Sequence, residues 1–232
     1  MHRKGVNEMK KRTKLSARAM PVYSRGEEQM NMITHIVGGG LGVLALFMCV
    51  GRAALHHNGW GAWTAVIYGI CMITLDTMSS VYHGLRDSMA KRVMQVLDHC
   101  TIYGLIAGTY TPIVLTALRP EDPALGWGLF ALEWALAALA ITLTAIDLKK
   151  YNAFSMTCYI CMGWAIIPFA GTIIRMLGAG CFWLLLGGGI AFTIGAILYG
   201  VGKKKKWIHS VFHIFVVIGT VLQFCAIYLY VM

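Results

Sequence analysis

The sequence predicts an all-α, polytopic membrane protein with seven transmembrane helices, and two observations support this fold class. Of the 232 residues, 58% are hydrophobic and only 13% are charged, whereas a soluble domain carries charge on about a quarter of its residues. The apolar residues also form long uninterrupted blocks, each long enough to cross a bilayer. We therefore expect a multi-pass protein of the cell membrane.

Seven apolar blocks follow a basic N-terminal arm at residues 1–26. The blocks lie at about 30–50, 61–83, 98–118, 125–146, 153–174, 181–200 and 207–231. The connections between them are too short for a soluble domain, so residues 27–232 are expected to form one transmembrane domain. The arm carries eight basic residues and one acid, and it is expected to be solvated and to lie on anionic lipid.

The basic residues predict the orientation in the membrane. If the N-terminus is cytoplasmic, seventeen of the twenty Lys and Arg residues lie in cytoplasmic segments, as the positive-inside rule requires. Seven crossings then leave the C-terminus outside. Because the net charge of +10 is explained by these connecting segments, we expect no nucleic-acid partner.

Three histidines and a carboxylate converge under this topology. His83 ends the second block, Asp98 begins the third, and His209 and His213 begin the seventh on one helical face. Three imidazoles with one open position are typical of catalytic zinc sites, and a nearby carboxylate can take a proton. Ser79 lies one turn deeper than His83 and could donate to a bound carbonyl oxygen. The competing interpretation is a set of interhelical hydrogen bonds without metal.

These residues resemble the motif of the progestin and adipoQ receptor family, above all its bacterial branch of hemolysin III-like membrane proteins. The matching stretches are Ser79-x-x-x-His83, Asp98 after a short loop, His209-x-x-x-His213, and supporting segments at 27–35 and 107–112. The resemblance implies seven helices with a cytoplasmic N-terminus. It also implies Zn²⁺ held by His83, His209 and His213. In this family pattern Asp98 contacts the metal through water and Ser79 lines the site.

Three functions follow as hypotheses. The first is a zinc-dependent hydrolase of lipid amides or esters, because the wider superfamily includes alkaline ceramidases; Asp98 would be the general base and Ser79 would stabilise the oxyanion. The second is a non-enzymatic protein of membrane homeostasis or sensing, in which zinc joins the helices. A pore-forming cytolysin is favoured least, because a released toxin needs a soluble state.

Other polar residues in the apolar blocks have less certain roles. Glu28, Asn31 and His35 share one helical face and could simply dock the first helix. Asp76 shares the face of His83 about two turns deeper. It could relay protons, contact a polar substrate group, or hydrogen-bond a Thr or Tyr of the third helix. Glu133 is a lone acid expected to face the bundle interior.

The histidine beside Asp98 is treated separately. His99 follows Asp98 directly in the sequence, and neighbouring residues point in different directions on a helix. His99 is therefore expected to point away from the site.

Overall fold

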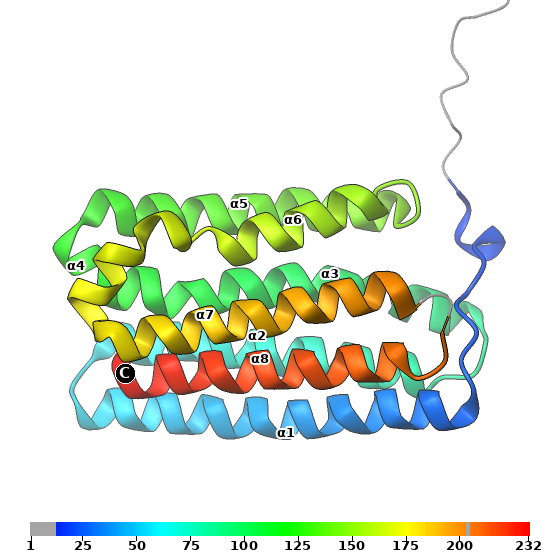
Figure 1. Ribbon diagram of the computed structural model, residues 1–232, viewed down its shortest axis with the longest axis horizontal. Coiled ribbons are helices and arrows are strands. Elements are labelled where there is room, and N and C mark those ends of the chain that lie inside the picture. Colours follow the sequence, from blue (N-terminus) through cyan, green and yellow to red (C-terminus); the bar gives the residue numbers. More distant parts are fainter. Residues whose placement is uncertain (1–12, 203–204) are drawn as a thin grey trace, which may run out of the picture.

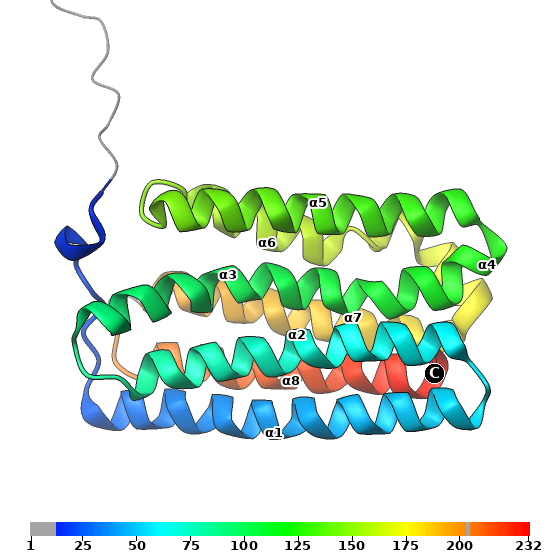
Figure 2. The same ribbon diagram turned by 180° about the vertical axis from the view of Figure 1, so that it is seen from behind.

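Long helices lying side by side make up the computed structural model, which describes residues 13–202 and 205–232 (Figures 1 and 2). No strand occurs within these residues. The elements in chain order are η1 (Leu15–Ala17), α1 (Arg25–Leu55), α2 (Gly59–Gly84), α3 (Met89–Pro112), the π-helical η2 (Ile113–Leu118), α4 (Arg119–Glu121), α5 (Pro123–Asp147), α6 (Asn152–Trp164), η3 (Ile167–Phe169), α7 (Ala170–Gly202) and α8 (Ile208–Tyr230). The predicted all-α class is confirmed.

Six helical stretches among the described residues are long and apolar enough to cross a membrane. They are Arg25–Leu55, Gly59–Gly84, Met89–Glu121, Pro123–Asp147, Asn152–Gly202 and Ile208–Tyr230. The fifth stretch has 51 residues, which would make a straight helix about 76 Å long, far longer than a bilayer core of about 30 Å. Instead, the chain leaves helical geometry at Gly178, where φ is 84°, and α6 and the main length of α7 run in opposite directions (Figure 1).

Polar caps in the short connections mark where several helices begin. Ser24 and Glu27 form a reciprocal capping box at the start of α1, and Asn58, Ser88 and Asp122 cap α2, α3 and α5. Such side chains satisfy backbone N–H groups that the first helical turn leaves free. The Glu27 carboxylate also accepts a hydrogen bond of 2.7 Å from the backbone of Trp207. This bond holds the beginnings of α1 and α8 together.

The segment before α1 contacts the helix ends at a few points, although every residue of 13–24 except Arg18 is exposed or half-buried. The backbone N–H of Thr13 donates to Asp147 at 2.8 Å, and the backbone carbonyl of Arg18 accepts from Arg92. The Arg18 side chain is buried. Partners at the ends of α3 and α5 therefore order this segment. Residues 1–12 of the predicted arm, like Lys203 and Lys204, lie outside the described residues.

The two ends of the helix bundle differ in their connections. The N-terminal segment and the loops joining α2 to α3 and α5 to α6 lie at one end, and the C-terminus lies at the other (Figures 1 and 2). Those two loops and the adjoining first turn of α3 contain Arg86, Lys91, Arg92, Lys149 and Lys150. The basic connections therefore gather at the end where α1 begins.

Candidate metal centre

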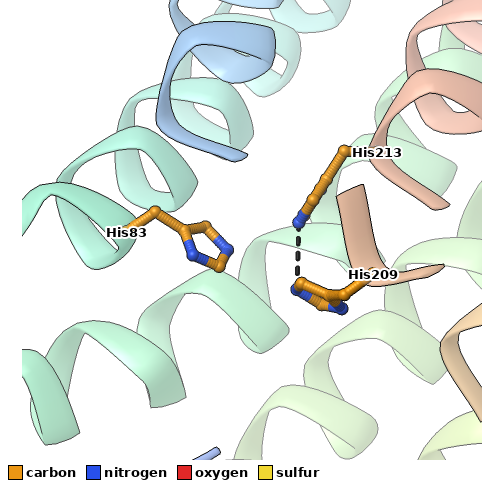
Figure 3. Close-up of side chains that lie close together, drawn as sticks. All are labelled: His83, His209 and His213. Carbon is orange, nitrogen blue, oxygen red and sulfur yellow. Dashed lines mark hydrogen bonds between the residues drawn. The ribbon is translucent and has the colours of Figure 1, made fainter. Parts of the chain in front are cut away.

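Three histidines from two helices lie close together at the end of the bundle where α1 begins. His83 comes from the last turn of α2, and His209 and His213 come from the first two turns of α8. Their rings approach one another from opposite sides (Figure 3). One nitrogen from each lies within 4.8 Å of the others, and all three residues are buried. The group could therefore hold a metal ion.

Local structure explains how α8 presents its two histidines. Trp207 precedes the helix with a left-handed backbone, φ 66°, which redirects the chain sharply into α8. His209 is then the second residue of the helix, and His213 lies one turn later on the same face. Their Nε2 atoms are 3.0 Å apart.

The donor set fits zinc in chemistry and in spacing. Zinc–nitrogen bonds of 2.0–2.1 Å in a tetrahedral site place ligand nitrogens about 3.3 Å apart by simple geometry. This value lies between two distances in the histidine group. The Nε2 atoms of His209 and His213 are 3.0 Å apart, and no two of the three ligand nitrogens are more than 4.8 Å apart. The Nε2 atom of His83 is buried without a hydrogen-bond partner among the described residues. A cation between the rings would satisfy this nitrogen.

A carboxylate on α1 holds the outer nitrogen of His83. Glu28 Oε2 lies 2.7 Å from His83 Nδ1, and Glu28 Oε1 lies 2.6 Å from Lys91 Nζ. A carboxylate only accepts hydrogen bonds, so Nδ1 carries the hydrogen and Nε2 keeps its lone pair. Hydrogen-bonded carboxylates of this kind commonly orient metal-binding histidines.

A second carboxylate reaches His213 through another histidine. Asp76 Oδ1 lies 2.8 Å from His35 Nδ1, and His35 Nε2 lies 2.6 Å from His213 Nδ1. The hydrogen bond suggested between Asp76 and a Thr or Tyr of the third helix is thus wrong, because His35 of α1 occupies that position. His35 likewise contacts the histidine group directly instead of only docking α1.

Asn31 completes the polar face of α1. Its Oδ1 accepts a hydrogen bond of 2.7 Å from the Ser210 hydroxyl of α8, and its Nδ2 lies 3.4 Å from His83 Nδ1. Because Glu28 is the much closer partner of that nitrogen, we assign the His83 hydrogen bond to Glu28. The spacing Glu28-x-x-Asn31-x-x-x-His35 was visible in the sequence. Its role was missed because the partners lie on other helices.

Asp98 and Ser79 line the same cavity as His209 and His213. This cavity, of about 160 Å³, begins at the histidines and continues between the helices past Ile106 and Phe192 to Gln223. The Ser79 hydroxyl is buried and has no hydrogen-bond partner within residues 13–202 and 205–232. The expectation that His99 points elsewhere is wrong. It lines this cavity too, with its Nδ1 3.6 Å from an Asp98 oxygen.

Tyr23 covers the histidines from outside the helices, a contact that the sequence did not suggest. Its ring stacks on His209 with centroids 4.8 Å apart and an angle of 15° between the planes. Burial, with a smaller contribution from nearby Tyr199 and carboxylates, raises the pKa of Tyr23 well above its usual range. The hydroxyl therefore remains protonated at neutral pH.

Glu133 lies away from the candidate centre. It is fully buried in α5, as expected for an acid facing the bundle interior. Neither carboxylate oxygen has a hydrogen-bond partner among the described residues. It is not among the residues that line the cavity.

Comparison with known proteins gives a consistent result. The family model described as "Haemolysin-III related" matches residues 23–224. The chain is 35% identical to "Hemolysin-3" of Bacillus cereus over 206 residues, covering 89% of this chain and 92% of the relative. It is 33% identical to the "Hemolysin-3 homolog" of Bacillus subtilis (strain 168), covering 90% and 96%.

A human protein is also similar. "Monocyte to macrophage differentiation factor" is 27% identical over 192 residues, which cover 78% of this chain and 77% of the relative. No solved structure matches the chain significantly. The matched region begins at Tyr23 and contains every residue of the histidine group and its carboxylate partners. This chain is a multi-pass membrane protein of the progestin and adipoQ receptor and hemolysin III family.

Proposed function

We propose that this protein binds Zn²⁺ through His83, His209 and His213 and hydrolyses an amide or ester bond of a membrane lipid. The proposal rests on one observation above all: two histidines of the group, His209 and His213, line a cavity that Asp98 and Ser79 also line. A structural zinc site is closed by four protein ligands, whereas a catalytic site keeps one position open to solvent or substrate. Three histidine ligands, two of which line a cavity, correspond to the second arrangement.

The residues have distinct roles in this proposal. Bound zinc would supply a Lewis acid that polarises a carbonyl group and acidifies water. Asp98 takes a proton from the attacking water and returns it to the leaving group. The Ser79 hydroxyl, which has no hydrogen-bond partner in the part of the chain that the structure describes, donates to the substrate oxygen as negative charge develops there.

The cavity favours a lipid over a polar substrate. Beyond the histidines its lining is largely apolar and includes Ile102, Ile106, Phe192 and Val216. A substrate that placed its scissile carbonyl beside Asp98 would lay an apolar portion against these side chains, with a favourable free energy from burial.

We also infer seven membrane crossings with a cytoplasmic N-terminus. The break at Gly178 and the reversal between α6 and α7 support two crossings within residues 152–202. The gathering of basic loops at the end where α1 begins supports a cytoplasmic position for that end, and therefore for the histidine group.

A non-enzymatic role in membrane homeostasis or sensing is the second candidate. It is favoured by the network of partners, because the histidines of α2 and α8 are both hydrogen-bonded to side chains of α1. Zinc would then join α2 to α8, and the hydrogen bonds would join both helices to α1. The relatives named hemolysin suggest lysis as a third role. Lysis is the least favoured role, because a released toxin needs a soluble state and these helices span the membrane permanently.

Metal content and hydrolysis separate these candidates. Mass spectrometry of the purified protein should find about one zinc per chain in the wild type, as three histidines imply, no zinc in His213→Ala, and retained zinc in Asp98→Ala. Asp98→Ala should also lose hydrolysis of a lipid amide. If Asp98→Ala loses zinc and stability together, the structural role is favoured. A folded wild type without metal would rule out both zinc-based functions.

A further inference from the structure

The proposed zinc ligand His213 has an unusual partner for its outer nitrogen. A metal-binding histidine commonly donates that N–H to a carboxylate, a carbonyl or water. Here the partner is a second imidazole, His35, and the carboxylate of Asp76 lies behind it. All three side chains are at most 6% exposed. Bulk water therefore does not replace these contacts.

The chemical nature of Asp76 determines the direction of each hydrogen bond in this chain. The carboxylate can only accept, so Nδ1 of His35 carries the hydrogen. In a neutral imidazole the other nitrogen is then a lone pair, so Nε2 of His35 accepts from Nδ1 of His213. The Nε2 atom of His213, which faces His209 at 3.0 Å, is left with its lone pair. This is the form that can bind a metal.

We propose that His35 and Asp76 are positioning residues that hold His213 in the tautomer and orientation needed to bind zinc. This inference rests on the proposed zinc site. It assigns to the helix α1 a part in metal binding, although α1 supplies no ligand. The Asp76 carboxylate on α2 fixes the tautomer of His35 on α1. His35 in turn accepts a hydrogen bond from His213 on α8 and so fixes the tautomer of His213.

A glycine on α1 makes room for the carboxylate. Gly38 lies one turn after His35, and a Cβ atom at this position would collide with the Asp76 carboxylate, approaching its Cγ to 2.7 Å. Any larger residue would therefore push Asp76 away from His35. Two positions further, Gly40 has open space where its Cβ would stand. Gly40 is exposed on the outer face of the helix.

Two matched pairs of variants of the full-length protein test the proposal. In the first pair, His35→Gln keeps an amide N–H for Asp76 and a carbonyl for His213, whereas His35→Leu keeps neither. In the second pair, Gly38→Ala displaces Asp76 without altering it, and Gly40→Ala adds the same methyl group to the outer face. The zinc affinity of each purified protein is measured by competition with a chromophoric chelator, and the absorption spectrum is recorded with Co²⁺ as a probe of ligand geometry.

We expect His35→Leu and Gly38→Ala to bind zinc about 10- to 100-fold more weakly and to show an altered cobalt spectrum. His35→Gln and Gly40→Ala should stay close to wild type. If His35→Leu does not fold, the glycine pair decides. The proposal is overturned if Gly38→Ala binds as tightly as Gly40→Ala, or if His35→Gln binds as weakly as His35→Leu. A wild type that binds no zinc would instead overturn the proposed function itself.

Discussion

Glu28 and His83 are 55 positions apart in the sequence, and their side chains meet at 2.7 Å. The same carboxylate forms an ion pair of 2.6 Å with Lys91, whose ammonium group also donates to the backbone carbonyl of Leu85. One carboxylate thus joins the beginning of α1 to the end of α2 and the beginning of α3. It also holds one of the three histidines by its outer nitrogen.

Replacing Glu28 should destabilise the protein. Glu28→Gln removes the charge that neutralises the buried Lys91, and the expected loss in free energy of unfolding is about 1–3 kcal/mol, moderated because the Glu28 side chain is 21% exposed. Denaturant unfolding in detergent measures it. Glu121→Gln, an exposed position in α4, is the control. Equal stability of the two variants would contradict the assigned ion pair.

Zinc should stabilise the folded protein, because it binds a site that the unfolded chain does not have. At a free zinc concentration about 100 times the Kd, the gain is about 2.7 kcal/mol, seen as a higher thermal midpoint that a chelator reverses. His209→Ala should lose this response. His56→Ala, exposed after α1 at the opposite end of the bundle, should keep it. A response of equal size in both variants would place zinc elsewhere.

Two glycines of α3 should respond oppositely to the same substitution. A Cβ at Gly108 would lie 2.7 Å from Cys71 Cβ of α2, whereas nothing lies within 4 Å of one at Gly104. Gly108→Ala should destabilise by about 1–3 kcal/mol. Gly104→Ala should gain up to about 1 kcal/mol from helix propensity. The unfolding midpoints of the two variants measure this difference. If Gly108→Ala leaves the midpoint unchanged, α2 and α3 can move apart without a loss of stability.

The raised pKa of Tyr23 predicts a loss of stability at alkaline pH. The folded state keeps the Tyr23 proton more tightly than the unfolded state, whose tyrosine pKa is about 10. The contribution of Tyr23 is therefore fully present below pH 10 and decreases as pH rises above it. The thermal midpoint of the wild type should fall relative to Tyr23→Phe above about pH 10. Parallel curves for the two proteins would show that the Tyr23 hydroxyl is not buried.

Apolar block length predicted most of the helices, and charge predicted which loops gather at one end. The predicted block at 153–174 is the weakest match, because α6 ends at Trp164 and the helical stretch continues through η3 into α7. The gap left between the predicted blocks 153–174 and 181–200 does contain Gly178, where the helix breaks. The positive φ of this glycine was not predictable from block length. A backbone angle of a single glycine is set by the packing of the elements on either side.

The histidine group was predictable for a different reason. His209 and His213 are one helical turn apart, so their shared face follows from helix geometry. The charge pattern then placed His83 at the same end of the bundle. Asp76 and His35 were visible as buried polar residues, but their pairing was not, because the depths of α1 and α2 relative to each other depend on how closely the two helices pack.

The amino-acid sequence was enough to predict an all-helical membrane protein, a basic end of the bundle, and three histidines that could share a metal. These follow from hydrophobic burial, charge and helical periodicity, which act locally along the chain. Three features became visible only in the folded chain: α1 supplies partners of the histidines, Tyr23 covers them, and His99 lines the cavity with Asp98. Hydrogen bonds between residues distant in the sequence require a particular register and separation of the helices. Close contacts, such as that of Gly38 with Asp76, determine this register and this separation.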